Sequence, residues 1–481
     1  MLLGLVLIPL LAAGGAFLLR SNSRRLGLLI GTALLHLALV VFSWRVDPHP
    51  LLGGWLALDA IGLIFLTLVS VVFICASLYA VEYLRREARR SNRTFVGCLL
   101  GFLAAMSLVT MSQHLGLLWV AVEGTTLASA PLIYFHHSQR SLEATWKYLL
   151  LCSVGIALAL LGTFFVAMAG SGHGGGDQPS LVVSELISAA GQLHLPWLKG
   201  GFLFFLVGYG TKMGLAPFHT WLPDAHSEAP SPASALLSGA LLNCAFLGIL
   251  RLFQVCVAAG LGAFVQELLV VFGVFSLVVA AVFIVGQSDY KRLLAYSSIE
   301  HMGILSLGVG LGGAGAYGAM LHAVNHSLTK ALLFFVAGNI LLAHGTKLAA
   351  DVRGLLRRLP VSGALLLGGF FAITGAPPFG LFLSEFTILN AAVSQGRMVV
   401  AALYLILLAV VFLGMGAIIL PMAQGQPADM ATGSPHAGRE SGLLVGVPLA
   451  LLIAVLVLGL YVPPSVNAAL SHAAQLVGGV P

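Results

Sequence analysis

The sequence predicts an all-α, polytopic membrane protein of about fourteen transmembrane helices, built from two inverted five-helix repeats that each contain a broken helix. Three observations predict this fold class: a very low charge content, apolar runs that recur along the whole chain, and two runs that prolines interrupt. Of the 481 residues, 59% are hydrophobic and only 8% are charged. Soluble domains carry about 25% charged residues, so the composition excludes an ordinary soluble fold.

The recurring apolar runs define the expected spans, because a helix needs about 20 apolar residues to cross about 30 Å of hydrocarbon. The first run has no basic residues before it, so we expect a first span and not a cleaved signal. Residues 170–198 are expected to form a loop with a short surface helix. The expected spans are 2–19, 26–43, 56–82, 94–112, 114–135, 146–169, 199–218, 233–256, 263–286, 292–311, 315–342, 362–394, 398–423 and 442–462.

The basic residues between these spans predict the orientation. Sixteen of them fall in alternate loops: Arg20, Arg24, Arg25, Arg85, Arg86, Arg89, Arg90, Arg93, Arg140, Lys291, Arg292, Lys347, Arg353, Arg357, Arg358 and Arg439. The other loops hold only Arg45, Lys199, Arg251 and Arg397. Cytoplasmic loops carry the excess of Lys and Arg. We therefore expect the first set inside the cell, and both termini on the outer face of the plasma membrane.

Prolines interrupt two of the expected spans. Pro217 interrupts the run at 199–218, and Pro377 and Pro378 interrupt the run at 362–394. Within a membrane such breaks are tolerated only where protein or a water-filled cavity covers the freed backbone. Each break falls in the fourth member of a set of five spans, which is typical of inverted-repeat transporters; a coincidence of common membrane prolines is the alternative. The expected units are a three-helix segment at 1–93, two repeats at 94–258 and 259–424, and a C-terminal helix at 425–481.

Several ionisable residues lie far from any expected loop. They are Glu123, Lys212, Glu300, His301, His322, His326, Lys330 and Glu385. Five buried charges would cost on the order of 15 kcal/mol, since each costs at least about 2.5–3.5 kcal/mol at the bilayer centre. Such a set persists only where the charges pair, hydrate or carry function. An acid beside a lysine can gain or lose a proton when a neighbouring charge moves, so the set predicts a proton relay.

A purely structural role remains an alternative for single members of this set. His322, His326 and Lys330 share one helical face at i, i+4 and i+8 spacing, yet one histidine alone is more often a satisfied core residue. Glu123 and Lys212 form a natural pair, which a structural ion pair would also explain. For Glu300 and His301 the sequence does not settle which face of their helix they occupy.

Other motifs in the sequence give weaker evidence of a functional site. The five cysteines lie in apolar stretches without metal-ligand spacing, so we expect packed thiols, no disulfide and no iron–sulfur cluster. The glycine-rich tract at 172–176 lacks the strand–helix frame of a phosphate loop. His136 and His137 have no third ligand nearby in sequence, which favours a hydrated helix end over a metal site. We expect no metal and no cofactor in this chain.

The stretch KMGLAPFHTWLPDAHSEAPSPASALLSG, from Lys212 to Gly239, resembles the antiporter-like, proton-pumping membrane subunits of respiratory complex I, of membrane-bound hydrogenases and of multisubunit sodium/proton antiporters. The resemblance continues through DYKRLLAYSSIEHMGIL, HAVNHSLTKALLFFVAGNIL and GAPPFGLFLSEFTILNAA, and covers roughly residues 95–425. The glutamate in SSIEHMG looks most like hydrogenase 4 component F.

The resemblance implies a role for each matching residue. Glu123 and Lys212 match the glutamate and broken-helix lysine of the first half, Lys330 the central lysine of the second half, and Glu385 the exit residue. His322 and His326 match the histidine stripe, and His219 and Asp224 belong to the signature that shapes the path by which protons enter. Many relatives carry a lysine where this chain has Asn243, so one relay station is missing or replaced by water.

The resemblance also implies a partner assembly. We expect a proton-translocating membrane subunit of a redox-driven pump of the NADH–quinone oxidoreductase or group 4 hydrogenase type, with redox catalysis in partner subunits and none in this chain. The alternatives are a subunit of a multisubunit sodium/proton antiporter, and a non-transporting membrane scaffold of a redox complex.

Overall fold

The structure is a computed structural model, which describes residues 1–46, 48–87, 91–171, 180–426 and 440–478. Arg89, Arg90, Arg439 and the glycine-rich tract at 172–176 lie outside these described residues. Within them the chain is helical, and the only β-type pairings are isolated bridges such as Leu51 with Leu56.

The helices follow the order of the predicted spans. They are α1 (Leu2–Leu18), α2 (Asn22–Ser43), α3 (Ala60–Arg86), α4 (Arg93–Met111), α5 (Leu115–Ile133), η1 (Tyr134–His136), α6 (Gln139–Gly170), α7 (Val183–Ser188), η2 (Ala190–Gln192), α8 (Leu195–Met213), α9 (Trp221–Glu228), α10 (Ser231–Leu236), η3 (Leu237–Leu241), α11 (Leu242–Ala258), α12 (Gly262–Ile284), α13 (Tyr290–Leu311), α14 (Ala314–His344), η4 (Ala349–Asp351), α15 (Leu355–Arg358), α16 (Pro360–Ile373), α17 (Gly380–Ser394), α18 (Met398–Gln424), α19 (Gly442–Leu460) and α20 (Pro464–Leu476). In the described part of the chain, ten helices are long and apolar enough to cross a membrane. This confirms a multi-pass membrane protein.

Three details of the prediction are wrong. α6 begins at Gln139 and not at 146, because Ser138 and Ser141 form a capping box that starts the helix among charged residues. The expected single C-terminal helix at 425–481 is two helices, α19 and α20, in the described part of that segment. Arg251 does not lie in a loop: it is inside α11, 1% exposed, and pairs with Asp59.

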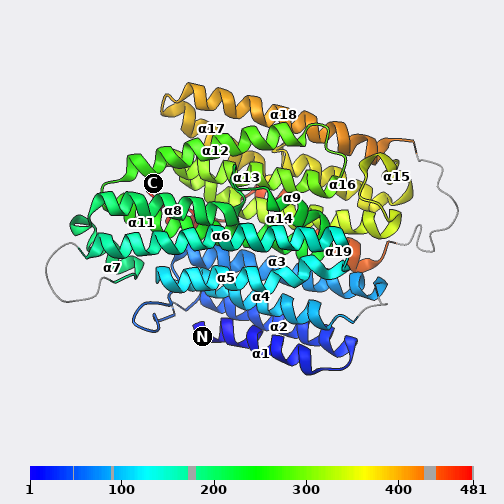
Figure 1. Ribbon diagram of the computed structural model, residues 1–481. Coiled ribbons are helices and arrows are strands. Elements are labelled where there is room, and N and C mark those ends of the chain that lie inside the picture. The colour runs from blue at the N-terminus through cyan, green and yellow to red at the C-terminus, as the bar shows by residue number, and fades with distance from the viewer. Residues whose placement is uncertain (47, 88–90, 172–179, 427–439, 479–481) are drawn as a thin grey trace.

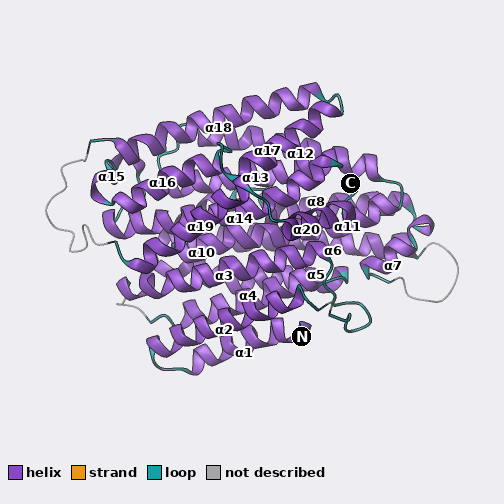
Figure 2. Cartoon of the chain, turned by 180° about the vertical axis from the view of Figure 1, so that it is seen from behind, coloured by secondary structure: helices purple, strands orange, loops and turns teal. Residues whose placement is uncertain are grey.

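The long helices lie side by side with nearly parallel axes (Figure 1). α1 and α2 form one edge of the bundle and α18 the opposite edge, and Figure 2 shows the same order from behind. The centre is formed by the continuous helix Ser231–Ala258 and by α14, whose most apolar stretches are 94% and 83% buried, against 33% for α18. α14 contacts helices from every part of the chain, including α3, α10, α13, α17 and α19. Polar side chains on α14 therefore lie in the protein interior.

The first helix break lies between α8 and α9. α8 ends at Gly214, which adopts the left-handed conformation at φ 86°. Two side chains cover the freed backbone: Trp221 Nε1 donates to the carbonyl of Thr211 at 2.8 Å, and Ser276 Oγ accepts from the amide of Ala216 at 3.0 Å. Protein groups thus replace the missing helical hydrogen bonds, as membrane depth requires.

The second break lies between α16 and α17. Gly375 has φ 64°, and the amide of Ala376 bonds to the carbonyl of Phe371 at 2.9 Å, closing the end of α16. Pro377 and Pro378 follow, and α17 resumes at Gly380. Both interruptions expected from the prolines are present, and each contains a cis X–Pro peptide bond.

The segment between α10 and α11 is a π-helical turn, Leu237–Leu241, inside an otherwise continuous helix. Such turns insert one extra residue into a helix and are frequent at functional sites. Asn243 and Arg251 both follow this turn. Its position decides which way these two polar side chains point.

Candidate functional site

Lys212 and Glu123 are linked through the hydroxyl of Thr126. Lys212 Nζ donates to Thr126 Oγ1 at 2.9 Å, and Thr126 Oγ1 donates to Glu123 Oε2 at 3.2 Å. The ion pairs of the described residues do not include Glu123 with Lys212. A hydroxyl both accepts and donates, so it joins the acid and the base without a direct salt bridge.

A second neutral partner also holds Lys212. Its Nζ donates to the hydroxyl of Tyr148 at 2.6 Å, and this hydroxyl lies 2.6 Å from Ser129 Oγ. On the other side Ser153 Oγ donates to Glu123 Oε1 at 2.8 Å. Lys212 is fully buried, whereas Glu123 is half-buried. The lysine is therefore held by hydroxyls inside the bundle, and the acid stands closer to its surface.

Lys330 on α14 is held in the same manner. Its Nζ donates to the backbone carbonyl of Leu294 at 2.7 Å and to Ser297 Oγ, both on α13. Glu300 and His301 are 2% and 1% exposed, so α13 presents both to the protein interior and not to lipid. This resolves the question that the sequence left open.

Three histidines gather between α13 and α14. His301 Nδ1 lies 2.9 Å from His322 Nε2, and His322 Nδ1 lies 3.0 Å from Ser384 Oγ on α17. The ring of His326 lies 5.1 Å from that of His301, centroid to centroid. Neither nitrogen of His326 has a hydrogen-bond partner among the described residues, nor does His301 Nε2. Buried polar atoms without partners are rare, so these nitrogens are candidates for binding a proton, a water molecule or an ion.

Glu385 completes this group. One carboxylate oxygen of Glu385, one ring nitrogen of His301 and one ring nitrogen of His322 lie within 4.8 Å of one another. Glu385 Oε1 has no described hydrogen-bond partner. Gly375 in the second break makes room for this carboxyl, because a Cβ at position 375 would lie 1.9 Å from Glu385 Oε2. Glu385 also lines an apolar groove of about 460 Å³ between α17 and α18.

Asn243, at the position where the resemblance implies a lysine in many relatives, is buried in α11. Its Nδ2 donates to Ser327 Oγ at 2.7 Å and to the carbonyl of Gly239 at 3.2 Å. Ser327 lies on α14, three residues before Lys330. Asn243 thus connects α11 to α14 by a hydrogen bond.

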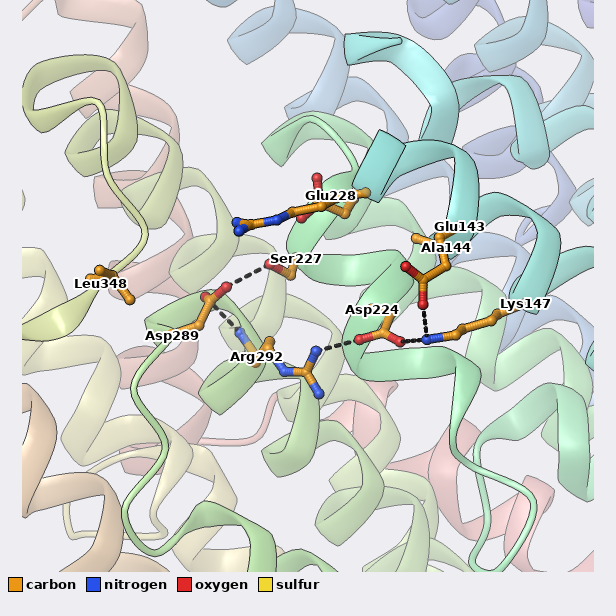
Figure 3. Close-up of a pocket in the computed structure, with 10 residues that line it drawn as sticks. Glu143, Ala144, Lys147, Asp224, Ser227, Glu228, Asp289, Arg292 and Leu348 are labelled. Carbon is orange, nitrogen blue, oxygen red and sulfur yellow. Dashed lines mark hydrogen bonds and ion pairs between the residues drawn. The ribbon is translucent and has the colours of Figure 1, made fainter. Parts of the chain in front are cut away.

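A charged cavity of about 480 Å³ opens at one end of the bundle (Figure 3). Among the residues that line it, Asp224 of α9 accepts from Lys147 Nζ of α6 at 3.0 Å and from Arg292 Nη1 of α13. The lining side chains are Arg140, Glu143, Ala144, Lys147, Asp224, Ser227, Glu228, Asp289, Arg292 and Leu348. One carboxylate therefore ties helices from both expected repeats at the mouth of the cavity.

The remaining predicted residues surround the breaks. His219 lies in the first break, 7% exposed, near the rings of Phe283 and Tyr296 and outside the cavity lining. Pro217, Pro377 and Pro378 are exposed.

Sequence reasoning missed the groups that connect the charges. Thr126 and Tyr148 hold Lys212, and Ser297 holds Lys330. His226 is fully buried, stacks on Phe334 at 5.1 Å, and has no described partner for either ring nitrogen. Thr126 follows Glu123 by three residues, a spacing that places the two side chains on one helical face. His226 could have been noticed in the sequence as a histidine within an apolar motif.

The bundle holds acids, lysines and histidines inside it through neutral partners, an arrangement that fits the antiporter-like membrane subunits that the sequence motifs resemble. The chain is a member of the NADH:quinone oxidoreductase/Mrp antiporter transmembrane family, which matches residues 112–415. This confirms the resemblance that the sequence motifs indicated.

Individual relatives and solved structures are consistent with this family. The hydrogenase-4 component F homolog of Methylacidiphilum infernorum is 36% identical over an alignment of 443 residues, and the alignment covers 90% of each chain. A chain of the archaeal membrane-bound sulfane sulfur reductase has a TM-score of 0.88 at 21% identity, with 99% of this chain and 98% of that chain covered. A chain of the Mrp complex from Dietzia sp. has a TM-score of 0.86 at 20% identity, covering 99% and 97%. At these identities the solved structures establish the shared fold.

Proposed function

We propose that the chain is a proton-translocating membrane subunit of a redox-driven pump, of the NADH–quinone oxidoreductase or group 4 hydrogenase type. Redox catalysis and its cofactors belong to partner subunits, and this chain carries none. The relay residues are Glu123, Lys212, Lys330, Glu385, Glu300 and the histidines 301, 322 and 326. Family membership and the hydrogenase-4 relative support the assembly.

The observation that carries the proposal is the bonding of Lys212. A buried lysine in a direct salt bridge is locked as a cation, because breaking the pair leaves an uncompensated charge. Lys212 instead donates to two hydroxyls, and Thr126 connects it to Glu123. A shift of charge near Glu123 therefore changes the energy of a proton on Lys212 without first breaking an ion pair.

Protons enter at the cavity around Asp224, beside the first break and His219, and Lys330 receives charge displaced from Lys212. Asn243 is too weakly basic to hold a proton, but its bond to Ser327 keeps a polar connection toward Lys330. The path leaves through the histidines and Glu385. Pro217, Pro377 and Pro378 open the two helices so that polar groups replace helical bonds at membrane depth.

The proposal includes the finer architecture. Fourteen spans place both termini outside the plasma membrane, with repeats at 94–258 and 259–424 inverted relative to each other and flanked by segments 1–93 and 425–481. The charged cavity then faces the cytoplasm, on the side with more Lys and Arg.

The test is Lys212→Ala in the intact complex, reconstituted in sealed vesicles, with electron transfer and proton uptake measured together. We expect proton uptake to fall while the complex stays assembled. The matched control is Lys199→Ala, which removes an exposed lysine from the other end of the same helix.

The outcomes separate the candidate functions. Unchanged proton uptake per electron in Lys212→Ala would contradict the relay and favour a scaffold. Proton movement that depends on sodium and needs no electron transfer would favour a sodium/proton antiporter subunit.

A further inference from the structure

The donor atoms of His301, His322 and Glu385 converge on one buried point. They come from three helices, α13, α14 and α17, and lie within 4.8 Å of one another. His322 is fully buried, and His301 and Glu385 are 1% and 6% exposed. Convergence from separate helices makes the geometry a property of the bundle and not of one flexible loop.

We propose that His301, His322 and Glu385 form a binding site for a divalent transition-metal cation, with Zn²⁺ as the ion that fits best. Two imidazoles and one carboxylate are a recurrent zinc donor set. Hard cations such as Mg²⁺ and Ca²⁺ prefer oxygen ligands, so imidazole nitrogens favour zinc over them.

The distances allow this ion with little movement. Zn–N bonds of about 2.0–2.1 Å in tetrahedral geometry place two ligand nitrogens about 3.3 Å apart. His301 Nδ1 and His322 Nε2 are 2.9 Å apart, so the rings need to separate by only a few tenths of an ångström. The hydrogen that the two nitrogens share then moves to His301 Nε2, which has no described partner.

The surrounding groups orient the ligands. His322 Nδ1 lies 3.0 Å from Ser384 Oγ, so a hydrogen on Nδ1 leaves Nε2 bare toward the ion. Metal-bound histidines almost always donate their other N–H in this way. Glu385 Oε1, which has no described hydrogen-bond partner, can turn toward the ion.

A groove at the surface of the bundle reaches Glu385. Glu385 lines the groove of about 460 Å³ between α17 and α18, together with Thr374 and Gly375 of the second break. The groove is open at the protein surface, and Glu385 is its charged residue.

Occupation by Zn²⁺ has a consequence that rests on the proposed function. The ion takes the lone pairs of His301, His322 and Glu385 that a proton would otherwise use. Zn²⁺ is therefore an inhibitor of proton uptake in this subunit, acting on the second half of the relay.

The test measures binding first and transport second. The intact complex is dialysed against buffered Zn²⁺ at micromolar concentration, and bound zinc per complex is counted by mass spectrometry. His322→Gln and Glu385→Gln are compared with wild type, and the control is the double variant His136→Gln, His137→Gln, which removes an adjacent histidine pair at a helix end. We expect one ion fewer in each site variant and no change at this site in the control.

X-ray absorption of the bound zinc provides a second readout, with nitrogen and oxygen neighbours at about 2.0–2.1 Å expected. Ser384→Ala, which keeps all ligands, is expected to weaken binding by about 10–100-fold. If His322→Gln does not assemble, Glu385→Gln and Ser384→Ala still decide the question. Equal zinc content in wild type and all site variants would overturn the site.

Transport separates the two proposals. Zinc bound at this site without slower proton uptake would preserve the site and contradict the relay through these histidines. Loss of proton uptake in Lys212→Ala, with no zinc bound at this site, would preserve the function and overturn the inference.

Discussion

Lys212 donates a hydrogen bond from Nζ to the hydroxyl of Thr126, at 2.9 Å and inside the bundle. The same hydroxyl donates to the Glu123 carboxylate. The acid and the base are thus coupled through one oxygen atom. Changing that oxygen separates them while leaving both charges in place.

Thr126→Val is therefore expected to slow proton uptake by about tenfold, since losing one hydrogen bond of about 1–1.5 kcal/mol changes a rate by about that factor. Valine keeps the shape of threonine and removes only the hydroxyl. Proton uptake per electron in sealed vesicles measures the effect.

Thr125→Val is the matched control. The hydroxyl of Thr125 donates to the carbonyl of Val122 at 2.6 Å and contacts neither charge. Equal losses in both variants would assign the effect to helix packing and not to the link.

Asp224→Asn is expected to slow proton uptake by about tenfold at low ionic strength, the lower end of what focusing by a charged cleft supplies. The variant removes the charge that Lys147 and Arg292 share at the mouth of the cavity. Added salt should shrink the difference, because ions screen partly exposed charges.

Glu143→Gln serves as the comparison for Asp224. Its carboxylate is 65% exposed and pairs only with Lys147 in the described ion pairs. A salt-independent loss in Asp224→Asn, or an equal loss in Glu143→Gln, would argue against focusing at Asp224.

Gly375→Ala is expected to displace the Glu385 carboxyl and reduce proton uptake. The new Cβ would lie 1.9 Å from Glu385 Oε2, and the left-handed backbone adds about 1–2 kcal/mol of strain. Gly345→Ala carries the same strain at φ 68° with nothing within 4 Å. Proton uptake that falls equally in both variants would mean that backbone strain, and not the position of Glu385, is responsible.

Asp59→Ala is expected to lower the unfolding stability by about 3–5 kcal/mol, because it leaves Arg251 buried without its partner. Asp59 Oδ1 accepts from Arg251 Nη2 at 2.8 Å and also caps α3 through the amide of Gly62. The unfolding midpoint of the complex in detergent measures the change. Adding Arg251→Met should recover most of it, apart from the lost cap.

Glu267→Ala breaks an exposed ion pair with Arg397. Its loss of unfolding stability is the reference with which the loss in Asp59→Ala is compared. Exposed pairs contribute about 0–1 kcal/mol. If Asp59→Ala were as mild as Glu267→Ala, Arg251 would have found water or another partner.

Much of the fold follows from composition and periodicity. The expected span 94–112 corresponds to α4, Arg93–Met111, and the expected interruption of 362–394 to the gap between α16 and α17. Apolar runs and prolines act locally, so one sequence suffices to locate them. The expected start at 56 was too early, because Leu56 pairs with Leu51 and Ser112, and Asp59 caps α3.

The site was predictable only in its charged members. A charged residue inside an apolar run is easy to recognise in the sequence because burying it costs free energy. This criterion identified Lys212, Lys330 and Glu385. Their neutral partners gave no such signal: Ser297 is one serine among many, and only tertiary packing brings it to Lys330. The contact between His301 and His322 likewise depends on how α13 lies against α14.

The π-helical turn at Leu237–Leu241 sets the rotational phase of the helix that follows it. One residue of an α-helix corresponds to about 100° of rotation, so a helix of the same sequence without the extra residue would present different faces beyond the turn. Asn243 would rotate away from Ser327, and Arg251 would rotate away from Asp59. A single inserted residue thus aligns two polar contacts on neighbouring helices, one toward α14 and one toward the start of α3.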